Sequence, residues 1–66
     1  MNKSIEVFKN ETGWNADFIG DAEVFAAFGS SVLPLPFTVR ASADTVLADV
    51  VARNPGVSVT LRAQGI

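Results

Sequence analysis

With 66 residues and a net charge of −2, the chain is long enough for one domain only, and we treat residues 1–66 as a single domain. It contains no cysteine and no histidine, which excludes disulfide bridges and the usual ligands of structural zinc. Its five basic residues are scattered along the sequence, so the chain lacks the basic cluster that nucleic-acid binding requires.

The first thirty residues predict a β-hairpin followed by a short helix. Residues 4–9 and 14–19 alternate between two faces, and the turn residues "NETG" separate them. Ile5 and Val7 share one face of the first strand, and Trp14 with Phe18 lies on one face of the second. The helix follows as "AEVFAAF", with Asp21 as its N-cap and Gly29 at its C-terminal end. Because so short a helix is unstable alone, we expect its phenylalanines, Phe28 among them, to be buried.

The middle of the chain carries the unusual segment "SVLPLPFT". Pro34 and Pro36 lack a backbone N–H and force the residues before them into extended conformations. We therefore expect Leu33 and Leu35 to be extended, with a strand over residues 37–41 at the edge of a sheet.

A second helix and a last strand complete the pattern. Ser42 is a suitable N-cap, and four apolar residues form one face of "ADTVLADVVARN", namely Val46, Leu47, Val50 and Val51. "NPG" at 54–56 ends the helix, and residues 57–63 alternate as a strand in which Val57, Val59, Leu61 and Ala63 face the core. The sequence thus predicts an α+β fold with the order β-β-α-β-α-β. We expect a small three- to four-stranded sheet with two helices packed on one face.

Self-association is the second expectation. Apolar residues make up 48% of the chain and charged residues only 18%, yet a domain of this size buries only about 60% of its unfolded surface. The chain therefore carries more apolar side chain than it can hide alone, and we expect a homo-oligomer, most simply a homodimer. Leu33, Leu35 and Phe37 are the candidate interface residues, acting as an apolar clasp against a second copy; packing within their own domain is the alternative.

Enzymatic chemistry has little support in the sequence. A serine nucleophile would lack its histidine base, and the serines are explained as helix-flanking residues. Asp21 and Glu23 lie together but serve the dipole of a helix, and the spacing of the carboxylates matches no metal-binding loop. We therefore predict no catalytic residues, no metal site and no cofactor, and we expect that the protein is not an enzyme.

Two stretches, "GWNADFIGD" and "FTVRASADTVLADVV", resemble those of HicB-type antitoxins. They share a hairpin with an aromatic residue after glycine and a capped helix that follows a strand. The resemblance covers about half of the chain and implies a regulatory role. The helix between Asp21 and Gly29 and the Leu-Pro-Leu-Pro segment depart from that pattern, and we do not assign the chain to the family.

Localisation and function follow from these points. "MNKSIEVF" lacks the apolar segment of a signal peptide, and no apolar stretch is long enough to span a membrane, so we expect a cytoplasmic protein. The function that fits best is a protein–protein interaction module that forms a homodimer, with an unidentified protein partner possible. The alternative is a module that binds a small ligand, in a pocket between the first helix, the Leu33–Phe37 arm and the sheet, or an antitoxin-like regulatory module.

Overall fold

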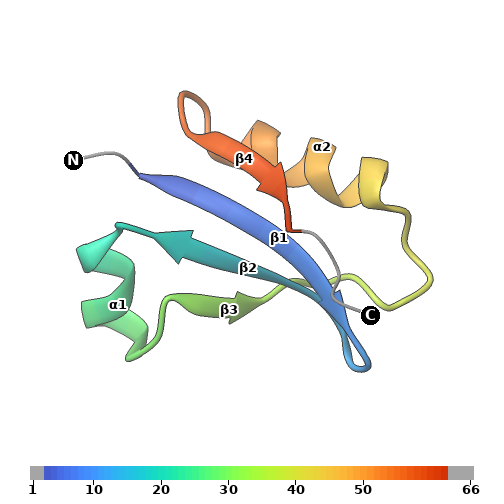
Figure 1. Cartoon of the computed structure of the whole chain (residues 1–66), viewed down its shortest axis with the longest axis horizontal. Helices are drawn as coiled ribbons and strands as arrows, with labels where there is room; N and C mark the ends of the chain where they lie inside the picture. Colours follow the sequence, from blue (N-terminus) through green and yellow to red (C-terminus); the bar gives the residue numbers. More distant parts are fainter. Residues whose placement is uncertain (1–2, 63–66) are drawn as a thin grey trace.

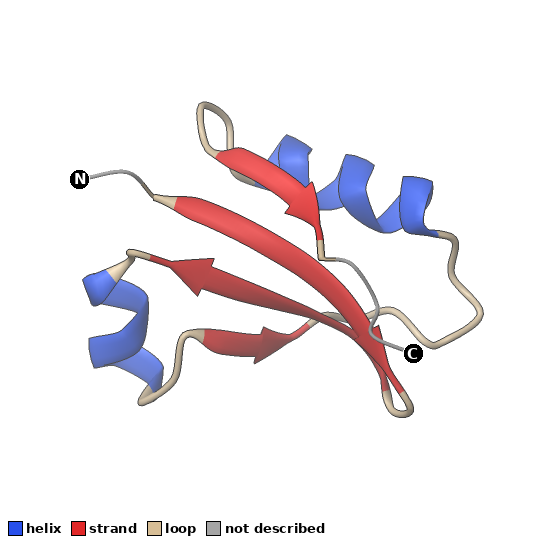
Figure 2. Cartoon of the chain, in the orientation of Figure 1, coloured by secondary structure: helices blue, strands red, loops and turns tan. Residues whose placement is uncertain are grey.

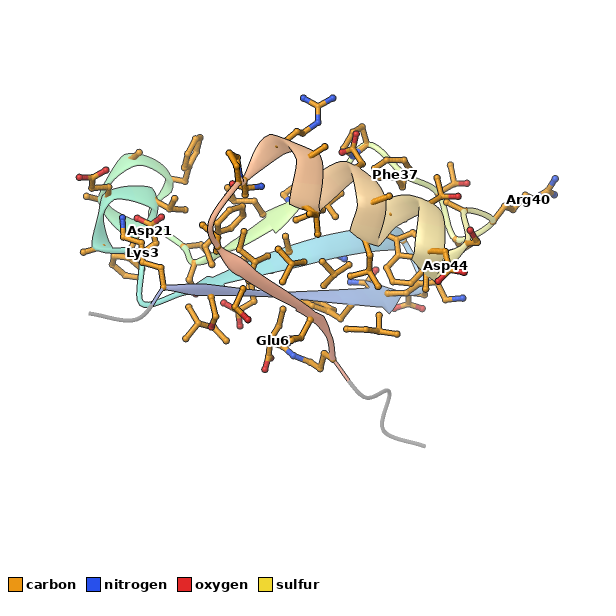
Figure 3. The ribbon with its side chains drawn as sticks, turned by 90° about the horizontal axis from the view of Figure 1, so that it is seen from above. Lys3, Glu6, Asp21, Phe37, Arg40 and Asp44 are labelled. Carbon is orange, nitrogen blue, oxygen red and sulfur yellow. The ribbon has the colours of Figure 1, made fainter. Side chains whose placement is uncertain are left out.

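The computed structural model describes residues 3–62, which form a mixed four-stranded sheet and two helices (Figure 1). The elements are β1 (Ser4–Asn10), β2 (Gly13–Ile19), α1 (Ala22–Phe28), β3 (Val32–Pro34), α2 (Ala43–Arg53) and β4 (Ser58–Leu61). This order confirms the predicted α+β class, and both helices lie on the same side of the sheet (Figure 3).

The sheet has the strand order β3-β2-β1-β4, with the two long strands in the middle and the two short ones at the edges (Figure 2). β1 and β2 form the predicted hairpin, in which Val7 lies opposite Ala16. β4 runs parallel to β1, with Val59 beside Ile5, and β3 runs antiparallel to β2. The last strand therefore pairs with the first, on the side of β1 away from β2, and α2 connects the two opposite edges of the sheet.

The core lies between the sheet and α2. Its buried apolar residues come from β1, β2 and α2: Ile5, Val7, Trp14, Ala16, Val46 and Val50. The alternation predicted for the hairpin places the strand residues on one face, and the four-residue spacing of Val46 and Val50 places both on the inner side of the helix. Leu47 packs against this core as predicted, whereas Val51 remains exposed.

The helix ends form where the sequence places them. The Asp21 carboxylate accepts hydrogen bonds from the backbone N–H groups of Glu23 and Val24, and Gly29 ends α1 in the left-handed conformation at φ 73°. Ser42 caps α2 by accepting a hydrogen bond from the N–H of Thr45. These contacts satisfy backbone groups that have no partner within the helices themselves.

The strand predicted over residues 37–41 is wrong. The third strand is Val32–Pro34, and residues 37–41 form a loop that leads to α2. The chain leaves the sheet after Phe37, where Thr38 starts a turn whose carbonyl oxygen accepts a hydrogen bond from the N–H of Ala41. The alternating residues of "FTVRA" therefore do not form a strand, because no neighbouring strand lies beside the residues after Phe37. The last strand, Ser58–Leu61, is shorter than the predicted strand over residues 57–63, and Ala63 lies outside the described residues.

The expectation that α1 buries its phenylalanines is also wrong. None of the α1 residues is buried, and 65% of Phe28 and 58% of Phe25 remain exposed. The reason is the position of the helix, which connects β2 to β3 beyond the end of the sheet instead of crossing its middle (Figure 1).

Gly13 generates the first testable prediction. It begins β2 at φ 139°, and a Cβ atom added there would lie 2.6 Å from the carbonyl oxygen of Phe37. Gly56, at φ 82°, has open space around the corresponding position. Gly56→Ala should therefore lower the free energy of unfolding by about 1–2 kcal/mol, the cost of the left-handed conformation alone. Gly13→Ala should lower it by clearly more, because the backbone at Phe37 must also move.

Urea unfolding followed by tryptophan fluorescence measures both losses. Equal losses for the two variants would show that the contact between Gly13 and Phe37 does not constrain the fold.

Candidate functional site

The candidate interface residues lie on the chain's own sheet. Leu33 pairs with Ala16 in β3, and Leu35 and Phe37 pack against the core while each remains partly exposed. Backbone hydrogen bonds continue past the end of β3: Leu35 N–H donates to Trp14 O at 2.9 Å, and Trp14 N–H donates to Phe37 O at 3.1 Å. The segment thus serves its own protomer first, and contact with a second copy stays a prediction.

The prolines of this segment close one edge of the sheet. Because backbone groups in a strand alternate in direction, the N–H of Leu35 faces β2 and the nitrogen atoms of Pro34 and Pro36 face away from it. Those outward positions have no N–H to offer. The remaining outward residue of β3 is Val32, whose N–H and carbonyl oxygen both bond to the Ser30 hydroxyl, at 3.1 and 3.3 Å. The β3 edge therefore presents no free N–H to an added strand.

The opposite edge is open. Arg62 N–H donates to Val7 O at 2.8 Å, so the backbone groups of Ser58 and Thr60, two and four residues earlier, also face β1. The N–H and carbonyl groups of Val59 and Leu61 consequently face outwards. Figure 3 looks down on this edge, and among residues 3–62 no strand or helix covers it. Leu61 is 47% exposed.

A second unpartnered surface surrounds α1. Phe25 borders a shallow hollow of about 310 Å³ between α1 and β2, whose other lining residues are Phe18, Gly20, Asp21, Ala22 and Ser31. The hollow is walled mainly by apolar atoms, and its one charged residue, Asp21, already caps α1 and lies 3.9 Å from the Lys3 ammonium group. It offers mainly apolar surface, and the Ser31 hydroxyl is the other polar side-chain group in its lining.

The sheet face away from the helices carries a charged cluster. Glu6 of β1 and Asp17 of β2 lie directly opposite each other. Two like charges in this position repel each other and destabilise the strand pair. The Arg62 guanidinium resolves this repulsion by donating to Glu6 at 2.8 Å and to Asp17 at 2.6 Å, and it stacks 4.5 Å from the ring centre of Phe8. These hydrogen bonds raise the pKa of Arg62, and the bond to Glu6 has the larger effect. Figure 3 shows Glu6 on the side opposite α2. The cluster is internally paired, so it fastens β4 to the hairpin.

The described residues contain no group of three or more carboxylates that could hold a metal ion. No helix among them is long and apolar enough to cross a membrane. Asp21 and Glu23, which lie close together in the sequence, have different roles: Asp21 caps the helix, and Glu23 is exposed on α1.

Comparison with protein-family models, with curated proteins and with solved structures finds no match for this chain. The candidate surfaces therefore rest on geometry alone. Two of them differ from what the sequence predicted: the β4 edge was missed, and α1 was expected to bury its phenylalanines, although a pocket beside this helix was considered. The signal for the first was present, because residues 57–61 alternate without a single charged side chain.

The closed β3 edge generates the second prediction. Replacing both Pro34→Thr and Pro36→Thr restores two outward N–H groups on a strand with high β-propensity. We expect the double variant to form larger assemblies than the parent chain at the same concentration, as measured by light scattering. Pro55→Thr, in the turn after α2, is the control and should leave the scattering unchanged. If the double variant scatters like the parent, the prolines do not protect the edge.

Proposed function

We propose that this chain is a protein–protein interaction module that forms a homodimer. The observation that carries the role in protein–protein contact is α1, a two-turn helix whose two phenylalanines are mostly exposed and none of whose residues is buried. A free helix of this length is marginal in water, and apolar surface of this kind on a small protein marks a contact site. The large exposed apolar side chains of the described residues support the same reading: Ile19, Phe25, Phe28, Val32, Val39, Val51 and Leu61.

The charge around α1 suggests the chemistry of a partner. Glu23 is exposed on the helix, and no basic residue lies in its last turn. A partner segment that places an apolar side chain in the hollow beside Phe25 and a basic residue near Glu23 would match this surface. In this proposal the dimer supplies two such surfaces, and the action is contact between proteins instead of catalysis.

A ligand-binding module is the second candidate, and the hollow is the observation that favours it. Its volume of about 310 Å³ lies at the lower end of the range for small-molecule sites. A thermal-shift screen against metabolites tests this candidate. A stabilising compound whose effect is lost in Phe25→Ser would replace the interaction module as the better assignment.

The homodimer generates the third prediction. Sedimentation equilibrium at micromolar concentration should give twice the chain mass of 7.0 kDa. The dimer should also persist at high salt, because apolar contact and backbone hydrogen bonds are not screened as charge pairs are. A chain mass of 7.0 kDa throughout the concentration range would contradict the homodimer.

The α1 surface generates the fourth prediction. Phe25→Ser and Phe28→Ser remove exposed apolar area, and serine and phenylalanine have similar helix propensities. Each should change the free energy of unfolding by less than about 1 kcal/mol, whereas a buried phenylalanine costs about 3–5 kcal/mol on truncation.

Phe18→Ser is the matched control, because Phe18 packs against the core, and it should be clearly more destabilising than either α1 variant. If Phe28→Ser costs as much as Phe18→Ser, α1 packs on its own protomer in solution and is not available to a partner.

A further inference from the structure

We propose that two copies of this chain join edge to edge through β4, so that their sheets become one continuous sheet. This inference rests on the proposed homodimer and names its contact surface. The two edges of the sheet differ in what they offer: the β3 edge has prolines and the Ser30 hydroxyl in the outward positions, whereas the β4 edge has the free N–H and carbonyl groups of Val59 and Leu61.

A strand added to the β4 edge must be extended, uncharged and able to return the same hydrogen bonds. β4 itself meets these requirements. An antiparallel pair of β4 strands about a two-fold axis at Thr60 places Val59 of each copy opposite Leu61 of the other. Both residues direct their N–H and carbonyl groups outwards, so each such pair exchanges two hydrogen bonds. The two pairs together satisfy every outward backbone group of Val59 and Leu61.

The side chains favour the same arrangement. Val59 and Leu61 neighbour Ile5 and Val7 on the face that α2 covers, so the two-fold axis brings apolar side chains of both copies together. Leu61, now 47% exposed, would gain this cover. On the opposite face Thr60 meets its own copy, a favourable cross-strand pair. No residue of Ser58–Leu61 is charged, so self-pairing brings no like charges opposite each other within the strand.

The position of α1 is compatible with this dimer. α1 adjoins β2 and β3, at the far side of the sheet from β4 (Figure 1). Edge pairing through β4 therefore leaves both α1 surfaces accessible, one at each end of the continuous sheet. The charged cluster of Arg62 also stays intact, since its partners Glu6 and Asp17 belong to the same protomer.

The first experiment removes one outward N–H. Leu61→Pro deletes a donor of the proposed dimer and spares the ladder to β1, because the N–H of Leu61 does not face β1. Leu61→Ala is the matched control, since it shortens the side chain and retains the donor. We expect Leu61→Pro to weaken the dimer about tenfold or more relative to Leu61→Ala, because two hydrogen bonds are lost per dimer. Circular dichroism verifies that both variants remain folded.

The second experiment tests the position of the two-fold axis. Thr60→Lys and Thr60→Glu each place like charges opposite each other in the dimer, so each variant alone should dissociate more readily than the parent. An equimolar mixture of the two should restore a dimer that contains one copy of each. Thr12→Lys and Thr12→Glu, in the exposed turn after β1, are the controls and should dimerise like the parent.

The outcomes separate the two proposals. Loss of the dimer in the single Thr60 variants, with recovery on mixing, supports pairing through β4. A parent dimer that Leu61→Pro and both Thr60 variants leave unchanged overturns β4 pairing while the homodimer stands. A parent chain that is monomeric at micromolar concentration overturns the homodimer and, with it, the edge pairing.

Discussion

The buried indole of Trp14 holds the parts of this fold together. It is 5% exposed, and its Nε1–H donates to Ala41 O at 3.0 Å. Its backbone accepts from Leu35 and donates to Phe37. One residue of β2 thus fixes the segment that follows β3. It also fixes Ala41, which directly precedes Ser42, the N-cap of α2. Since α2 supplies Val46 and Val50 to the core, the position of the core helix depends on this contact.

The requirement at Gly13 follows from the same contact. The Phe37 carbonyl must come close to the start of β2 to accept the Trp14 N–H, and this leaves no room for a side chain at Gly13. The hairpin and the proline segment are therefore fitted to each other at backbone level. This explains why so many apolar and proline residues are placed in a segment that adds only a three-residue strand: they seal an edge and pack on the core at once.

The two edges of the sheet differ, so only one of them can accept an added strand. A small sheet has two edges, and each is a template for another strand unless it is blocked. Here prolines and a serine hydroxyl block one edge, while the other ends in a short uncharged strand. In the dimer that we propose, assembly through the single open edge would stop at two copies, because the dimer would present only blocked edges. In the same proposed dimer, the exposed phenylalanines of α1 would lie away from the β4 contact, so one chain could combine self-association with contact to another protein.

Local patterns in the sequence were sufficient for the helices, their caps and the hairpin, because those features depend on residues within a few positions of each other. The alternation of Ile5 and Val7 and the caps at Asp21 and Ser42 were predicted for this reason. The third strand was misplaced because strand pairing depends on what lies beside a segment, and only the contact with Trp14 shows that the sheet ends at Phe37. The exposure of α1 and the open edge of β4 were likewise decided in three dimensions, since both depend on where an element lies relative to the ends of the sheet. An apolar helix face looks the same in sequence whether it meets a core or a second molecule.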